Sequence, residues 1–289
     1  MDGIILIDKP INWTSRDVVN KVGKILQTKK IGHNGTLDPN ATGVLVLCLG
    51  KALKLVDLVT SLEKEYEAEV ILGYSTDTLD VIGNVTKKES TEHISEEKIR
   101  KTLKHFCKTY NQEVPVYSSV KVNGKKLYEY ARENIEVKLP KKCVTISSID
   151  LISDITNIEN TKTFKIRCQV SKGTYIRSLV RDIGEHLNVA STMGSLRRIK
   201  QGNYDIADCQ KIEDIEINGF QIISIEEIIQ DLPSISVDVI VEKKIRNGMV
   251  LPKFFSTPRC VIKNNEGILL AIYEISAKDE RFVRPYVMF

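Results

Sequence analysis

Residues 32–50 read GHNGTLDPNATGVLVLCLG, and this stretch places a single carboxylate inside a glycine-rich loop. Pro39 directly follows Asp38 and restricts the backbone of that aspartate to extended conformations. The glycines on both sides allow a ligand or another chain to approach the backbone closely. On residue chemistry alone, an aspartate beside a proline is most often a turn or capping residue, so the loop is only a candidate for a catalytic site.

The sequence on either side of this loop predicts a mixed α/β chain with short connections. One short apolar run and two segments of alternating apolar and polar residues indicate strands, and helical spacing is found in three other segments. The expected strands cover residues 4–7, 66–72 and 164–170, and the alternation places Tyr66 on the inward face of the second. The expected helices begin after Thr14, which forms a capping box with Asp17, after Ser95 and at Ile176. Residues 32–43 are expected to form a polar loop. Strands that pair through hairpins, with helices at varied spacing, predict an α+β fold with an antiparallel or mixed sheet.

The sequence changes in character near residue 232. Pro233 is followed by short apolar runs, which Asn247-Gly248 and the turn-forming residues 264–267 separate. We therefore expect a main domain over residues 1–232 and a small, β-rich domain over residues 233–289. A domain of that size is expected to depend on the main body for part of its stability.

The composition is that of an ordinary globular protein. The 289 residues are 42% hydrophobic and 28% charged, and the net charge of +4 permits a polyanionic partner without requiring one. The six cysteines lie far apart without a Cys-x-x-Cys pair, which favours free thiols in a reducing cytoplasm. The apolar run after Met1 is too short for a signal peptide, and no apolar stretch reaches the roughly 18 residues of a membrane span.

Several chemistries are disfavoured by spacing. Residues 43–51 superficially suggest a phosphate loop, but six residues separate its two glycines where that loop needs four. A strand followed by G-x-G-x-x-G is missing, and so are the H-x-E and P-C-x-x-C motifs of zinc deaminases. The four histidines are dispersed, so no metal site follows from local spacing. A reaction without a metal or another cofactor is therefore the expectation.

Five blocks, in order and in spacing, resemble the TruB family of bacterial tRNA pseudouridine synthases. The blocks are residues 3–15, 32–50, 64–85, 114–132 and 171–187. The resemblance implies a pseudouridine synthase catalytic domain followed by a small PUA-like RNA-binding domain. It also implies an enzyme that isomerises the T-loop uridine of tRNA, position 55 in conventional numbering, to pseudouridine without a cofactor.

The resemblance implies roles for five residues around one pocket. Asp38 matches the required catalytic aspartate, which could attack the base, attack C1′ of the ribose, or remove a C2′ proton. Arg177 would hold the charge and orientation of that carboxylate. Tyr66 would stack on the target base and take part in the last deprotonation, while Tyr175 and Leu196 would form walls of the pocket.

Other residues are expected to contact or support the RNA. His33 resembles the histidine that enters the space left in the T loop when the uridine is extruded. Lys9 and Lys121 are candidates for supporting or RNA contacts, and Arg197, Arg198 and Lys200 could hold phosphates. The expected partner is the T arm of tRNA, bound by a cytoplasmic monomer with no membrane association and no obligatory protein partner.

Two alternatives remain open on sequence. A tRNA chaperone could use the same loop to open the T loop without chemistry, although a pure binder does not need a carboxylate facing RNA phosphates. An unrelated hydrolase with an aspartate nucleophile would need a metal or a second catalytic base, and the sequence indicates neither.

Overall fold

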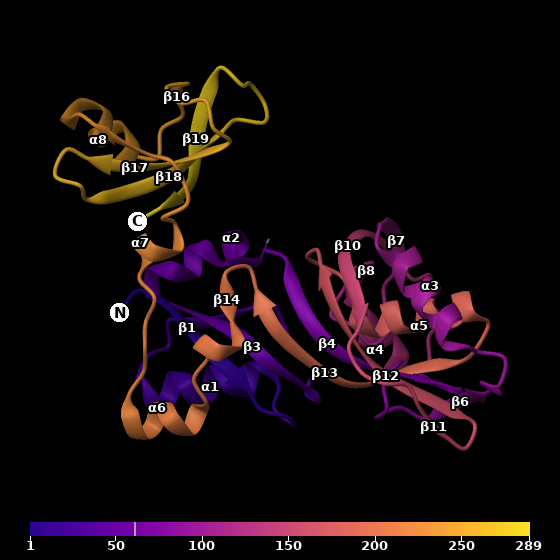
Figure 1. Cartoon of the computed structure of the whole chain (residues 1–289). Helices are drawn as coiled ribbons and strands as arrows, with labels where there is room; N and C mark the ends of the chain where they lie inside the picture. The colour runs from indigo at the N-terminus through magenta and orange to yellow at the C-terminus, as the bar shows by residue number, and fades with distance from the viewer. Residues whose placement is uncertain (61) are drawn as a thin grey trace.

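The described residues form a ten-stranded sheet in this computed structural model, which describes residues 1–60 and 62–289 (Figure 1). The strands are β1 (Gly3–Lys9), β2 (Ile31–Asn34), β3 (Ala41–Leu49), β4 (Lys64–Leu72), β7 (Thr109–Glu113), β10 (Lys141–Leu151), β11 (Thr156–Ile158), β12 (Thr161–Val170), β13 (Ser191–Gln201) and β14 (Tyr204–Asp205). The main path runs β1-β3-β13-β4-β12-β10-β7, and only the β3–β13 pair along it is parallel. The α+β prediction with a mixed sheet is therefore confirmed.

One half of the sheet is covered by two helices. Strand β4 buries alternate residues, as its sequence pattern predicts, and pairs with β12 over its whole length. Helix α3 (Glu96–Phe106), capped by Ser95, and helix α5 (Ile176–Leu187) pack on this half. Apolar residues of β4, β12, β13 and both helices form one core cluster, so this half is held mainly by apolar burial.

The other half of the sheet is covered on both faces. Helix α1 (Ser15–Ile25) begins at the predicted Thr14–Asp17 capping box and packs with α6 (Ile212–Asn218) against β1 and β3. Three short helices cover the opposite face, η1 (Gly50–Leu55), α2 (Val56–Thr60) and α7 (Ile225–Ile228). The short helix η2 (Ile206–Asp208) follows β14. The residues of β1 and β3 thus alternate between two cores.

The predicted polar loop of residues 32–43 is wrong at both ends. Strand β2 pairs with β3 from Ile31 opposite Leu49 to Asn34 opposite Val46, and β3 begins at Ala41. The continuous apolar run of β3 is buried, so its backbone groups need hydrogen-bonding partners along both edges. Residues 35–40 alone form the loop, and His33 lies in a strand.

A separate five-stranded sheet follows the main body (Figure 1). Its order is β15-β17-β18-β19-β16, and helix α8 (Val239–Arg246) packs against it. The strands are β15 (Ser234–Val237), β16 (Leu251–Pro252), β17 (Arg259–Asn264), β18 (Leu269–Ile275) and β19 (Phe282–Met288). Val261, Ile272 and Val287 share a core cluster with Ile4 and Leu6 of β1, so this small sheet is packed against the body.

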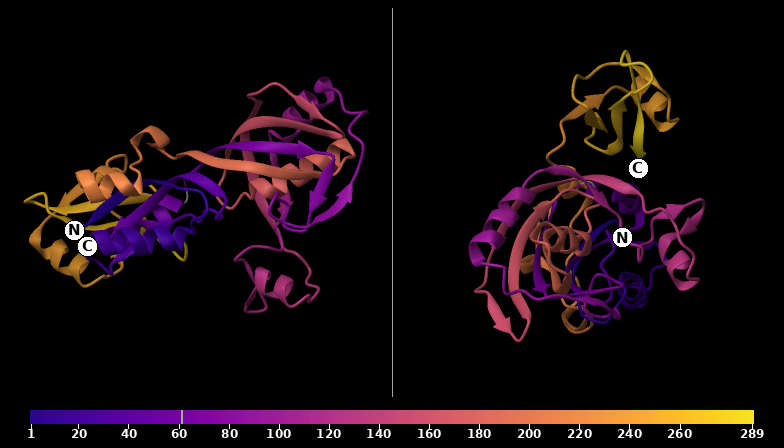
Figure 2. Two further views of the ribbon diagram at one scale, coloured as in Figure 1. Left: turned by 90° about the horizontal axis from the view of Figure 1, so that it is seen from below. Right: turned by 90° about the vertical axis from the view of Figure 1, so that its right-hand side faces the viewer.

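Two hairpins lie outside the sheets. Strands β5 (Tyr74–Thr76) and β6 (Val85–Lys88) form one, and β8 (Lys121–Val122) and β9 (Lys125–Lys126) form the other. The second hairpin and α4 (Leu127–Arg132) belong to residues 116–139, which project from the body in the left view of Figure 2. We call residues 116–139 the arm. Among the helices described, none combines the length and apolar character needed to cross a membrane.

Candidate active site

The loop that carries Asp38 is fixed by groups from β1 and α1. Ser15 accepts a hydrogen bond from the backbone N–H of Leu37 at 2.9 Å and donates to its carbonyl at 3.2 Å. The carbonyl of Pro39 accepts from the Asn12 N–H and from the Lys9 ammonium, at 2.8 and 3.2 Å. Residues on both sides of Asp38 are therefore held in place, and two of their three partners, Ser15 and Lys9, are buried.

Arg177 lies next to Asp38, in the first turn of α5. Its Nε is 3.0 Å from Oδ2 of Asp38, and the Arg177 side chain is 6% exposed while that of Asp38 is 38% exposed. The two remaining guanidinium nitrogens donate to the carbonyls of Thr78 and Tyr117, both at 2.9 Å. The cation is thus buried and fully oriented, and the carboxylate that it faces is open to solvent.

The pair lies in a pocket of about 440 Å³. Five residues singled out in the sequence line it together, namely Asp38, Tyr66, Tyr175, Arg177 and Leu196. The pocket combines aromatic and apolar walls with a few charged groups, among them the Asp38–Arg177 pair, which is the usual character of a site for a small ligand. Tyr175 is half-buried, and this burial raises its pKa, which favours the neutral phenol.

Three adjacent strands place Tyr66 next to Arg198. Arg198 of β13 lies opposite Tyr66 of β4 on one side and opposite Gly43 of β3 on the other. Gly43 has φ +103°, and a Cβ there would lie 2.1 Å from the Arg198 carbonyl oxygen, so only glycine fits. The Arg198 guanidinium approaches the Tyr66 hydroxyl at 3.4 Å. Tyr66 is buried with its hydroxyl against this cation.

The proposed phosphate cluster of Arg197, Arg198 and Lys200 is not a surface cluster. Arg198 is 1% exposed and donates to the carbonyls of Val44, at 2.7 Å, and Gly35, at 3.0 Å. Arg197 pairs with Asp8 at 2.8 Å. The expectation for Arg198 is wrong because its side chain points into the body, where it ties the Asp38 loop to β13.

The remaining three predicted residues lie outside the pocket lining. Lys9 is fully buried, and its ammonium contacts the carbonyls of Pro10, Trp13 and Pro39, so its place is a supporting one beneath the loop. His33 is half-buried in β2, and burial lowers its pKa, with Arg16 and Arg198 adding to the effect. Lys121 is exposed on the arm.

Sequence reasoning missed two buried charged residues of the site. Asp80 is buried, and its Oδ2 lies 4.0 Å from Nη1 of Arg177. Lys64 lines the pocket and is buried, with its ammonium on the carbonyls of Thr60 and Leu62, at 3.0 and 2.8 Å. Burial is the main cause that lowers the pKa of Lys64 to about 8. Asp80 sits in a turn-like run, TDTLD, in which nothing local indicates burial.

Comparisons with known proteins agree along the whole chain. The sequence model of the TruB family pseudouridylate synthase N-terminal domain matches residues 23–176. That of the tRNA pseudouridylate synthase B C-terminal domain matches residues 177–227. The chain is 40% identical to the tRNA pseudouridine synthase B of Halalkalibacterium halodurans, across 100% of this chain and 97% of the relative. The Bacillus subtilis protein of that name is 38% identical, across 94% and 93%.

Solved structures share the fold. A Cbf5-Nop10-Gar1 complex contains a chain that is 25% identical with a TM-score of 0.65, across 94% of this chain and 78% of that one. An H/ACA RNP bound to a substrate RNA that contains 2′-deoxyuridine contains another, 22% identical with a TM-score of 0.68. That match covers 99% of this chain and 84% of the other.

Proposed function

Because the chain belongs to the TruB family of pseudouridylate synthases, it isomerises uridine in tRNA to pseudouridine, and we propose that Asp38 is the catalytic carboxylate. The observation that carries this assignment is the 3.0 Å contact between Asp38 and Arg177 inside the pocket. The buried guanidinium of Arg177 holds the Asp38 carboxylate in a fixed position, and a nucleophile or a base must be positioned in this way against the group on which it acts.

The isomerisation conserves all atoms of the uridine. The bond between N1 of the base and C1′ of the ribose breaks, and a bond between C5 and C1′ forms. The proton on C5 leaves, and N1 gains a proton. No oxidant, reductant or water is consumed, so the charged and aromatic groups of the pocket can supply what the reaction requires.

We assign the pocket walls to the flipped base. Tyr66, Tyr175 and Leu196 line a volume of about 440 Å³, a size that admits one nucleoside. Extruding a base from a folded RNA costs on the order of a few kcal/mol, which stacking and apolar contact in such a pocket offset. In this arrangement Tyr66 stacks on the uracil ring, and Asp38 faces the sugar or the base.

We propose that the substrate is the T-loop uridine, position 55, on the T arm of tRNA. Lys121 is exposed on the projecting arm and can meet RNA phosphates, and His33 lies in β2, which leads directly into the Asp38 loop. Lys9 supports the loop through the Pro39 carbonyl. Such recognition would depend on the shape of the loop and on splayed bases, as is usual for RNA.

We further propose a cytoplasmic monomer without an obligatory protein partner. One chain supplies Asp38, Tyr66, Tyr175 and Arg177 to the same pocket, which supports a site that is complete in a monomer. All six cysteines are free thiols, as expected for a reducing compartment.

Residues 1–232 would form the catalytic domain and residues 233–289 the PUA-like RNA-binding domain, a division supported by the separate sheet that begins at β15.

Tritium release tests the function and the role of Asp38 together. Unmodified tRNA that carries tritium at uridine C5 is incubated with the protein, and tritium in water is counted. We expect about one tritium per target uridine from the wild type and none from Asp38→Ala. Asp38→Asn should still bind tRNA. If the wild type binds tRNA and releases no tritium, the protein acts as a T-loop chaperone instead.

A further inference from the structure

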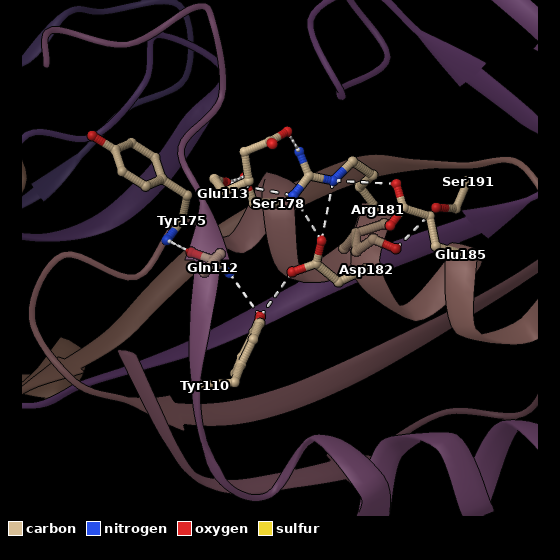
Figure 3. Close-up of polar contacts among 10 residues, drawn as sticks. Tyr110, Gln112, Glu113, Tyr175, Ser178, Arg181, Asp182, Glu185 and Ser191 are labelled. Carbon is tan, nitrogen blue, oxygen red and sulfur yellow. Dashed lines mark hydrogen bonds and ion pairs between the residues drawn. The ribbon is translucent and has the colours of Figure 1, made fainter. Parts of the chain in front are cut away.

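A chain of side-chain hydrogen bonds joins β7 to the start of α5 (Figure 3). Gln112 is 1% exposed, and its Oε1 accepts from the backbone N–H of Tyr175 at 2.8 Å. Its Nε2 donates to the hydroxyl of Tyr110 at 3.0 Å. That hydroxyl donates to Oδ2 of Asp182 at 2.9 Å. This series of hydrogen bonds therefore ends at the backbone of Tyr175, whose side chain lines the pocket.

The direction of every bond in this chain is set by its charged end. Arg181 pairs with Asp182 at 2.7 Å, and a carboxylate can only accept hydrogen bonds. Tyr110 must therefore donate its one proton to Asp182. Burial raises the pKa of Tyr110, and the charge of Asp182 adds to the effect, so the hydroxyl keeps that proton.

This direction decides which way the amide of Gln112 faces. Once Tyr110 has donated its proton to Asp182, its oxygen can only accept, so the NH₂ group of Gln112 must face Tyr110. The carbonyl oxygen of Gln112 is then left to face the N–H of Tyr175. A reversed amide would place NH₂ against N–H and leave two buried donors without acceptors.

The N–H that Gln112 holds lies at the N-cap of α5. Tyr175 provides no side-chain cap, and the first N–H groups of a helix have no partner within the helix. Arg177, which pairs with Asp38, follows two residues later. A shift of the N-cap would therefore move the guanidinium relative to Asp38 and the Tyr175 ring relative to the pocket.

We propose that Gln112, oriented by Tyr110 and Asp182, is a positioning residue that sets Arg177 and Tyr175 against Asp38. The role rests on the proposed function, because it acts through the Asp38–Arg177 pair. Gln112 touches neither reacting group and is absent from the pocket lining. Its effect is on the geometry of the chemical step and not on contact with RNA.

The test compares Gln112→Leu with Ser178→Ala. Ser178 donates to the carbonyl of Glu113 at 2.8 Å, so it joins the same strand and helix with a bond of equal length but does not touch the Tyr175 N–H. Three quantities are measured for each variant: the single-turnover rate of tritium release at saturating enzyme, the Kd for tRNA, and the Tm.

We expect Gln112→Leu to lower the single-turnover rate about tenfold, as one lost hydrogen bond would, with Kd unchanged. Ser178→Ala, at a similar loss of Tm, should retain the wild-type rate. Tyr110→Phe should slow the reaction in the wild-type background but not when combined with Gln112→Leu, since residues that act through one another are not additive.

Equal slowing by Gln112→Leu and Ser178→Ala, or an additive effect of Tyr110→Phe in the double variant, would leave Gln112 a purely structural role and overturn the proposal. If Gln112→Leu does not fold, Tyr110→Phe alone decides, and an unchanged rate overturns it. These outcomes differ from those that would contradict the proposed function. In that case the wild type itself would release no tritium, or Asp38→Ala would release as much tritium as the wild type.

Discussion

Asp80 lies 4.0 Å from Nη1 of Arg177, so the cation that pairs with Asp38 also faces a second, buried carboxylate. Asp80 accepts from the Thr78 hydroxyl at 2.6 Å and from the Ile82 N–H at 3.2 Å, which fixes it in a tight turn. Arg177 thus lies between the solvent-accessible carboxylate of Asp38 and the buried carboxylate of Asp80.

Asp80→Asn should slow the reaction without unfolding the protein. The amide keeps the size of the carboxylate but removes its charge, so Arg177 loses part of its orientation. We expect the single-turnover rate to fall about tenfold, because a weak ion-pair interaction with the buried cation is lost, with Tm nearly unchanged. Asp77→Asn, at a half-buried position of the same turn where the carboxylate accepts from the Asn84 N–H, is the control. A wild-type rate for Asp80→Asn would contradict this role.

Arg198→Ala should destabilise the fold far more than Arg197→Ala. The Arg198 side chain is 1% exposed, and its loss leaves the carbonyls of Val44 and Gly35 without partners beside a cavity. We expect a loss of roughly 3 kcal/mol or more. Arg197 is part-exposed and pairs with Asp8, so its removal should cost about 1 kcal/mol or less. Denaturant unfolding of both variants measures the difference, and equal losses would contradict the buried role.

Lys64 should make stability rise with pH in alkaline solution. Its pKa is about 8 in the folded state and near the ordinary 10.5 in the unfolded state, so between these values the unfolded chain binds more protons. The cost of burying the charged ammonium is fully present below pH 8 and disappears as pH rises toward 10.5.

Lys64→Met should lack this dependence. Between pH 8 and pH 10 the variant should lose roughly 2 kcal/mol of stability relative to the wild type, measured as the difference in unfolding free energy at each pH. Comparison at the same pH removes the contribution of the tyrosines and cysteines that both proteins share. A constant difference across this range would show that Lys64 keeps its ordinary pKa.

Deleting residues 233–289 should weaken tRNA binding more than chemistry. It should also lower Tm, because Val261, Ile272 and Val287 cover part of the core behind β1. Kd and the single-turnover rate at saturating enzyme separate the two effects. Ile240→Ser, at a position 71% exposed in the same domain, is a control for surface change alone. A fall in rate as large as the fall in affinity would count against an accessory role.

Affinity for tRNA should decrease as salt rises. Each phosphate contact releases counterions, so the logarithm of the binding constant falls linearly with the logarithm of salt concentration. Titrations at several salt concentrations measure the slope of this line. Lys121→Ala should reduce the magnitude of the slope by about 1, the value for one lost phosphate contact. An affinity independent of salt would contradict phosphate contacts altogether.

The period-two pattern of β4 was enough to predict that Tyr66 faces inward, and the Thr14–Asp17 box was enough to predict where α1 begins. These features are local, so the local sequence determines them. The nearness of Arg177 to Asp38 came only from the family resemblance, since 138 intervening residues carry no spacing rule.

Asp80, Arg198 and the strand position of His33 could not be read from the sequence. Each depends on which strands become neighbours: Arg198 is buried because β13 runs between β3 and β4, and β2 forms because β3 has a free edge there. The buried position of Lys9 could not be predicted from the local sequence either. A lysine at the end of a strand reads as exposed, and only the folded loop brings three carbonyls to its ammonium.

Strand β13 has a consequence for how substrate meets enzyme. Strand β13 pairs with β3, which follows the Asp38 loop, and with β4, which carries Tyr66. The spacing between these two sides of the pocket is therefore set by the same strand. Widening the gap between them would break sheet hydrogen bonds on both edges at once. We therefore expect the RNA to change conformation on binding while the pocket does not. The target nucleotide must fit the existing distance between the two sides of the pocket, so the enzyme selects RNAs by how readily they deform.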